Sequence, residues 1–261
     1  MMSRATKNEV RKQPYIIVAT SQKGGVGKTT AAVHLAFGLK ECGKNVLLVD
    51  ADTQGNASSI LSRDAAINTK AGGAELLFQQ NIKNLLGTKT SSGIDLLHGH
   101  VGLEALDKTF DLTKSGDVKD YLQSLPYDFI VFDTPPAIGV RQVAPMIWAD
   151  LLLIPLEPSP LSTSGLASTM RVIKRLIESG QNSKLNWKIL VNRYKSSSKL
   201  QSQIIQDVSA KFPEKLLKVT MPERVSVSTC LAQGLPIWKM KGVSSEVSSP
   251  WKNLPQSLNL V

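Results

Sequence analysis

A glycine-rich loop that ends in a lysine and two threonines constrains this chain more than any other stretch. The loop, Ser21–Thr30, lies between a short apolar run, Tyr15–Thr20, and a run of helix-forming residues. Glycines let a backbone turn sharply and bring its N–H groups close to a ligand, and a helix N-terminus adds partial positive charge at the same point. Strand, glycine loop, lysine, hydroxyl and helix in this order predict a phosphate-binding loop.

The residues of this loop have separate expected roles. Lys28 can reach the β- and γ-phosphates of a nucleotide, and the Thr29 hydroxyl can ligate Mg²⁺. The usual spacing has a glycine five residues before the Gly-Lys pair, but this chain has Gln22 there, with a second lysine beside it. The other predicted nucleotide contacts are Lys23, Gly24, Gly25, Val26, Gly27 and Thr30.

Two further apolar runs end in carboxylates. Asn45–Asp50 continues into Asp52, and Asp128–Asp133 ends in a third acid. Such runs are typical of buried parallel strands, which deliver their last residues to the sheet edge where α/β proteins bind ligands. Phosphoryl transfer needs a positioned Mg²⁺, neutralised charge and a water in line, so Asp50, Asp52 and Asp133 are the candidate acids.

The alternation of apolar runs with helical segments predicts the fold class. Further strands are expected at Leu151–Pro155 and Trp187–Asn192, and an amphipathic helix at Thr163–Ser179. The 261 residues, of which 42% are hydrophobic and only 5% aromatic, suit one α/β domain with an aliphatic core. We therefore expect a single-domain, mostly parallel twisted sheet flanked by helices, the architecture of a P-loop NTPase.

The two ends of the chain show little pattern. Residues 1–13 are polar and charged, so we expect a flexible basic tail that precedes an ATPase domain at 14–261. The chain from Ser244 onward is polar and carries no clear periodicity. The two cysteines are far apart and fit no metal spacing, which favours a cytoplasmic protein without disulfides. No apolar run reaches the roughly 18–20 residues that a membrane span needs.

The segment Lys23–Thr30 resembles the deviant Walker A motif of the ParA/MinD superfamily of ATPases. Residues 50–56 and 129–136 resemble two further acidic motifs of ParA-type partition ATPases, and the resemblance covers most of the chain. It implies ATP and Mg²⁺ as ligands. It also implies a homodimer in which Lys23 crosses the interface to the partner's nucleotide.

The resemblance also assigns roles to single residues. Lys23, Lys28 and Asp52 are implied as catalytic, with Asp52 positioning the attacking water. Metal binding is implied for Thr29, for Asp133 as the Walker B acid, and for Asp50 through water. On the adenine side, the resemblance implies contacts from Asn192 and Pro222.

The sequence departs from the family pattern at several positions. Thr53 stands where these proteins usually have proline, and Glu223 and Ser226 stand where many relatives carry arginine. That region helps to bind DNA in those relatives, so Arg224 is the candidate substitute, but the DNA surface cannot be copied residue by residue.

A basic composition points to a polyanionic partner. The net charge is +10, and eight basic residues between positions 184 and 218 are opposed only by Asp207 and Glu214. Such a patch predicts salt-dependent, sequence-independent contact with DNA phosphates, while an ordinary solvated face is the alternative. The DNA-contact candidates are Arg193, Lys195, Lys199, Lys211, Lys215, Lys218 and Arg224.

The leading interpretation is a partition ATPase that is cytoplasmic and associated with the nucleoid. ATP would drive dimerisation and nonspecific DNA binding, and a ParB-like or cargo-adaptor protein would stimulate hydrolysis, segregating a plasmid or chromosome. One alternative keeps this cycle and positions a protein microcompartment or a chemoreceptor cluster. A membrane-associated MinD-like regulator would need a C-terminal basic amphipathic helix, which two prolines oppose. The intact lysine, hydroxyl and acids oppose a DNA-binding protein without enzymatic activity.

Overall fold

The computed structural model describes residues 13–63, 73–79, 82, 85, 87–160 and 162–261. Its centre is an eight-stranded sheet in the order β3-β4-β2-β5-β1-β6-β7-β8. Every neighbouring pair is parallel except β3 and β4. The predicted mostly parallel α/β sheet is thereby confirmed, whereas the basic tail predicted at 1–13 lies almost wholly outside the described residues.

The strands are short and mostly buried. The first four along the chain are β1 (Tyr15–Ala19), β2 (Val46–Asp50), β3 (Thr88–Lys89) and β4 (Asp95–Leu97). The other four are β5 (Phe129–Asp133), β6 (Leu151–Leu156), β7 (Asn186–Tyr194) and β8 (Leu216–Pro222).

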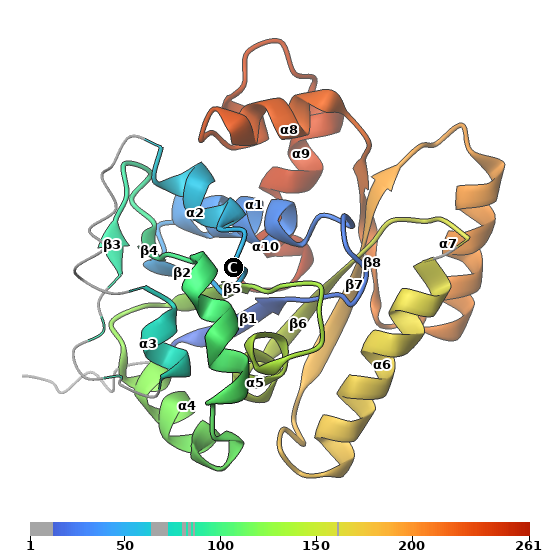
Figure 1. Ribbon diagram of the computed structural model, residues 1–261. Coiled ribbons are helices and arrows are strands. Elements are labelled where there is room, and N and C mark those ends of the chain that lie inside the picture. The colour runs from blue at the N-terminus through green and yellow to red at the C-terminus, as the bar shows by residue number, and fades with distance from the viewer. Residues whose placement is uncertain (1–12, 64–72, 80–81, 83–84, 86, 161) are drawn as a thin grey trace, which may run out of the picture.

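Helices cover both faces of the sheet (Figure 1). One face carries α1 (Lys28–Glu41), α2 (Asn56–Leu61), α8 (Val225–Ala232), η4 (Ile237–Lys239), α9 (Ser245–Lys252) and α10 (Leu254–Ser257). The other face carries α3 (Glu75–Phe78), η2 (Val101–Lys108), η3 (Leu112–Lys114), α4 (Ser115–Ser124), α5 (Val140–Trp148), α6 (Ser162–Glu178) and α7 (Lys199–Lys211).

The strands send alternate side chains into two separate cores. Ile16 and Val18 of β1 belong to the core beneath α5 and α6, whereas Ile17 and Ala19 belong to the core beneath α1. Both sets are fully buried or nearly so. This two-sided burial explains why the central strands are continuous apolar runs rather than alternating ones.

The C-terminal segment corrects the expectation of an unpatterned tail. From Ser245 it forms α9 and α10, which pack on α1. Its apolar residues stand at positions 247, 251, 254 and 258, a helical spacing that the surrounding serines and two prolines obscured. Trp251 and Leu254 are completely buried, so this segment is part of the core.

His34 ties α1 to that C-terminal segment. Its Nδ1 lies 2.9 Å from the Thr30 carbonyl oxygen, and its Nε2 accepts a hydrogen bond from the Ile237 amide at 3.3 Å. The imidazole also packs against Trp238 and Trp251, with centroid separations of 5.9 and 4.6 Å. These contacts require the neutral Nδ1–H form, and burial lowers the pKa of His34 to about 4.

Stability should therefore fall as the pH falls from about 6.5 towards 4. In this window His34 is protonated in the unfolded chain but stays neutral in the folded one. This difference lowers the free energy of unfolding by up to about 3 kcal/mol. Urea denaturation at fixed pH values measures the effect, and His34→Gln is the control because it removes the titrating group. A pH dependence equally steep in both proteins would contradict this assignment.

Candidate nucleotide site

The phosphate loop and the three acids meet at one edge of the sheet. Strand β1 lies between β5 and β6, and β5 also pairs with β2. The register places Ala19 beside Asp133 and Asp133 beside Asp50. Because these strands are parallel, the loop that follows β1 begins where the two acid-bearing strands end.

The loop adopts a backbone that only its glycines accept easily. Gly25 and Gly27 have φ values of +76° and +93°, in the left-handed region that side chains disfavour. The Asn192 Nδ2 donates to the Val26 carbonyl at 2.8 Å. A Cβ added to Gly27 would lie 2.2 Å from that Nδ2, so both conformation and space require glycine here.

Gly27→Ala should consequently impair nucleotide binding by at least about tenfold, because it combines backbone strain of about 1 kcal/mol with a clash against Asn192. Equilibrium titration with a fluorescent ATP analogue measures the loss. Gly43→Ala is the matched control: Gly43 has φ +75° but nothing within 4 Å of the added Cβ. Equal affinity in the Gly27 variant and the unmodified protein would contradict the described loop geometry.

Lys28 lies buried among the acids at the start of α1. The residue is 7% exposed. Burial lowers the pKa of its ammonium group, while Asp133 and Asp52 raise it. The structure therefore brings together the loop lysine and the acids that the sequence analysis singled out.

Asp50 is completely buried and fully engaged. Its Oδ2 accepts hydrogen bonds from the Ser58 amide and hydroxyl at 2.8 and 2.7 Å, and its Oδ1 accepts one from the Asp52 amide at 3.2 Å. Burial raises the pKa of Asp50 to about 6 despite these bonds. Ser58, which the sequence analysis did not single out, therefore orients this carboxylate. The indirect contact of Asp50 with a metal stays a prediction.

Asp133 is a buried carboxylate whose oxygens lack hydrogen-bond partners among the described residues. Burial and the neighbouring Asp50 raise its pKa well above the usual value, while the nearby Thr29 hydroxyl and Lys28 lower it. An orphaned carboxylate beside a threonine hydroxyl suits Mg²⁺, which favours oxygen ligands and keeps several waters or phosphate oxygens.

A prebuilt protein cage is not needed for such an ion. Among the residues that the structure describes, no group of three or more His, Cys, Asp or Glu residues could hold a metal. Mg²⁺ bound to a nucleotide commonly takes only one or two protein ligands. Thr29 and Asp133 thus fit the predicted metal site.

Asp52 lies on the turn that follows β2. Its Oδ1 accepts a hydrogen bond from the Gln54 amide at 3.0 Å, and its main-chain oxygen accepts one from Gly55 at 3.1 Å. These bonds close the turn although Thr53 replaces the usual proline. The side chain is 9% exposed and close enough to raise the pKa of Lys28.

Lys23 is held within its own subunit. Its Nζ donates to the Ser159 hydroxyl, in the loop after β6, at 2.8 Å. On the facing helix α6, a Cβ added to Gly165 would lie 3.0 Å from the Lys23 Cβ, so the glycine leaves room for this side chain. Sequence offers no signal for a contact that spans 136 residues, and Ser159 was not predicted.

The two predicted adenine-side residues line one cavity. Asn192 and Pro222, with Thr30 of α1 among the other lining residues, border a cavity of about 320 Å³ at the same sheet edge. Asn192 also holds the phosphate loop through Val26. Its position therefore joins the loop to this cavity.

The seven DNA-contact candidates lie between β7 and the start of α8, and their surroundings differ. Arg193 and Arg224 line the cavity just described, and Lys195 pairs with Glu223 at 2.7 Å. Arg193 also pairs with Glu157 at 3.4 Å. The remaining four lie on α7 and around the start of β8: Lys199, Lys211, Lys215 and Lys218.

A buried arginine, Arg141, holds the main chain of the turn that follows β2 and carries Asp52. The guanidinium of Arg141 pairs with Asp107, with Nη2 at 3.0 Å from Oδ2, and its Nη1 donates to the Ala51 carbonyl at 3.4 Å. The Ala51 amide in turn donates to the main-chain oxygen of Asp133 at 2.9 Å. The peptide between Asp50 and Asp52 is thus fixed from both sides, by residues that no sequence motif marks.

Comparisons with known proteins agree with this geometry. A family model described as an AAA domain matches residues 14–187. The chromosome-partitioning ATPase Soj of Treponema pallidum is 34% identical over 230 residues, which cover 85% of this chain and 88% of Soj. The chain belongs to the ParA family of P-loop ATPases.

Two other comparisons extend the match, one in sequence and one in fold. The chromosome partitioning protein ParA of Caulobacter vibrioides is 29% identical over 229 residues, 85% of each chain. A solved structure of a Cyanothece McdA variant in complex with ATP superposes with a TM-score of 0.83 at 22% identity, covering 96% of this chain and 98% of that one. The predicted family and fold are confirmed, whereas the individual residue roles stay predictions.

Proposed function

We propose that this ParA-family ATPase binds Mg²⁺–ATP at the edge formed by β1, β2 and β5 and hydrolyses it to ADP and phosphate. The observation that supports this most directly is the buried Lys28, which follows a loop with two glycines in the left-handed region and lies close enough to Asp133 and Asp52 for both to raise its pKa. Among the described residues no carboxylate lies within ion-pair distance of the Lys28 ammonium group, and a buried charge without such a partner is costly, so an anionic ligand is its natural complement.

Different residues of the site bind the phosphates, the metal, the attacking water and the base. Loop N–H groups and Lys28 bind the phosphates, and Thr29 and Asp133 hold Mg²⁺, which when bound offsets the charge that develops on the phosphate oxygens. Asp52 orients the attacking water, while Asp50, fixed by Ser58, supports the metal's water shell. The cavity of about 320 Å³ that Asn192 and Pro222 line takes the base.

The active form is a face-to-face homodimer. Lys23 belongs to the phosphate loop, and its ammonium group donates to a neutral serine rather than to a carboxylate. Exchanging that hydroxyl for a phosphate oxygen of the partner's ATP is electrostatically favourable. ATP thereby acts as the dimerisation switch.

The dimer binds DNA through phosphates, and the better candidate surface is the group Lys199, Lys211, Lys215 and Lys218. Among the described residues, none of these four has a carboxylate partner within ion-pair distance, whereas Arg193 and Lys195 are paired. Lys211 and Lys215 instead stand over the rings of Phe212 and Trp187, at 5.7 and 5.1 Å. Unneutralised cations release more counterions on binding DNA.

ATP-dependent affinity for duplex DNA should fall steeply with salt and depend little on sequence. Lys211→Ala/Lys215→Ala should reduce the slope of log K against log salt by about 2, because two phosphate contacts are lost. Fluorescence anisotropy with two unrelated duplexes measures this, and Lys89→Ala/Lys239→Ala is the control because both lysines are exposed but paired with a carboxylate. Equally strong binding without ATP, or a flat salt response, would contradict the proposal.

The cycle segregates DNA, with a ParB-like partner that stimulates hydrolysis and releases the dimer from the nucleoid. ParA and Soj, the relatives with substantial identity, are both named for chromosome partitioning. A protein cargo, as in a microcompartment or chemoreceptor cluster, remains the second candidate. Following labelled plasmid and labelled protein assemblies in cells that lack this ATPase distinguishes them by which one loses its position.

A membrane-based role receives no support from the C-terminus. The apolar residues of α9 and α10, Trp251 and Leu254 among them, pack into the core rather than facing outward. No helix of the described chain has the length and hydropathy to span a bilayer.

A further inference from the structure

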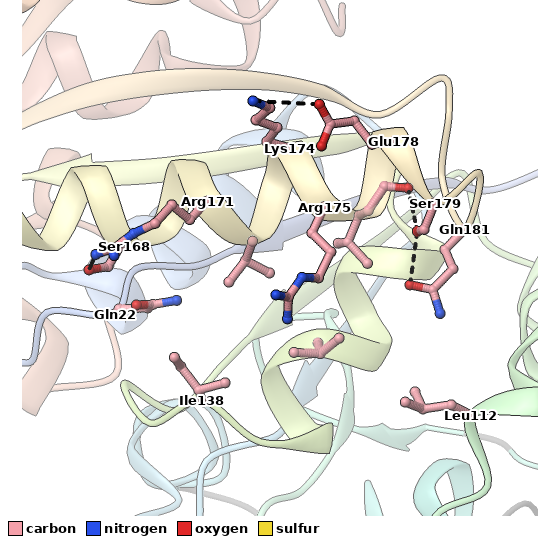
Figure 2. Close-up of a pocket in the computed structure, with 13 residues that line it drawn as sticks. Gln22, Leu112, Ile138, Ser168, Arg171, Lys174, Arg175, Glu178, Ser179 and Gln181 are labelled. Atoms are coloured by element: carbon pink, nitrogen blue, oxygen red, sulfur yellow. Dashed lines mark hydrogen bonds and ion pairs between the residues drawn. The ribbon is translucent and has the colours of Figure 1, made fainter.

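A long groove lies between α6 and the segment around α5, outside the nucleotide site. Its volume is about 930 Å³. Gln22 of the phosphate loop stands at one end, and Ser179 and Gln181 stand at the other (Figure 2). Figure 2 shows Arg175 pointing from α6 into the space between that helix and the segment that carries Ile138.

The two walls of this groove differ in chemistry. The opposite wall presents Ile138, which is 67% exposed, and Leu112, which is 41% exposed. The α6 wall presents Arg171, Lys174 and Arg175. Large apolar side chains this exposed on the rim of a concave surface indicate a binding site.

The described residues leave most of the charge of the α6 wall without a carboxylate partner. Among them, one acidic residue lines the groove: Glu178, which pairs with Lys174 at 3.6 Å. Arg171 donates to the Ser168 hydroxyl at 2.8 Å. Within the described residues, neither Arg171 nor Arg175 has a carboxylate within ion-pair distance, so two guanidinium groups face a largely apolar wall.

We propose that this groove docks a short acidic segment of a partner protein. Its carboxylates pair with Arg171 and Arg175, and its apolar side chains cover Ile138 and Leu112. Guanidinium groups favour carboxylates because two parallel N–H bonds match the two oxygens. Duplex DNA would leave the apolar wall uncovered, and a flat bilayer surface does not enter a groove with two walls.

The groove is connected to the phosphate loop. The Gln22 amide donates to the Thr169 hydroxyl of α6 at 3.3 Å, and Lys23 follows Gln22 directly. A segment bound in the groove therefore contacts Gln22 of the loop and helix α6, and both are neighbours of Lys23. We infer that docking also changes the rate of hydrolysis. This second inference rests on the ATPase cycle proposed above, whereas the docking itself does not.

The test begins with a phage-displayed library of random twelve-residue peptides, selected on the full chain. Selected peptides should share two or more Asp or Glu residues beside large apolar residues. Their affinity, measured by fluorescence anisotropy, should fall at least about tenfold in Arg171→Glu/Arg175→Glu because two ion pairs become repulsive. Lys184→Glu/Lys241→Glu carries the same charge change on exposed residues elsewhere and should change the affinity less than about twofold.

Several results would overturn the proposal. One is a selection without acidic residues, and another is an equal loss of affinity in both double variants. A third is that no peptide binds while the protein floats with phosphatidylglycerol vesicles and the Arg171→Glu/Arg175→Glu variant does not. That result would indicate a membrane as the ligand of the groove. Circular dichroism verifies that the variants fold. Peptide binding to Lys28→Ala separates the two proposals, because docking must persist there even if the chain does not hydrolyse ATP.

Discussion

Lys28→Ala should abolish measurable ATP binding and reduce hydrolysis by about 100- to 1,000-fold, the usual loss when one preorganised charge contact is removed. Lys28 is buried at the first position of α1, directly after Gly27 of the loop, so its charge should act on bound phosphates with little screening by water. Titration with a fluorescent ATP analogue and phosphate-release assays measure both effects.

Lys40→Ala is the control for the Lys28 variant. It removes a lysine from the last turn of the same helix, far from the loop. Thermal unfolding of both variants distinguishes loss of the ligand contact from loss of the fold. An ATP affinity unchanged in a folded Lys28→Ala protein would refute the phosphate-loop assignment.

Asp52→Ala should separate binding from chemistry. The carboxylate belongs to the turn after β2 and is not part of the phosphate loop, so ATP affinity should stay within about threefold while hydrolysis falls at least about 100-fold. Because hydrolysis no longer resets the switch, dimers should accumulate with ATP. Light scattering after size-exclusion chromatography measures that population.

The matched control for this variant is Asp207→Ala, which removes a carboxylate from an exposed face of α7. It should neither slow hydrolysis nor increase the dimer population. Rapid hydrolysis by Asp52→Ala would exclude this residue as the group that positions water. Another acid at the same edge would then have to take that role.

The parts of the fold that could be predicted are those whose signals are local. A continuous apolar run closed by an acid specifies a buried parallel strand and its end together, and β2 and β5 match their predicted positions within one residue at the start. The loop that carries Lys28 is similarly fixed by adjacent glycines. Local sequence therefore identified this site's edge, its lysine and its acids.

The parts that could not be predicted depend on contacts across the chain. Arg141 and Asp107 meet because α5 and η2 pack together, and Lys23 meets Ser159 because β6 lies beside β1. The spacing of the basic residues in space also needs the structure: Lys199 and Lys211 stand at opposite ends of one helix, about 18 Å apart at 1.5 Å per residue.

The packing of α9 and α10 on α1 has a consequence for the order in which the protein matures. Helix α1 begins with Lys28 and Thr29, yet its buried face is completed by Trp251 and Leu254. Synthesis must therefore reach Leu254 before this face of α1 is covered. A nascent chain that has not reached that residue leaves the apolar face of the helix that carries Lys28 and Thr29 open to water.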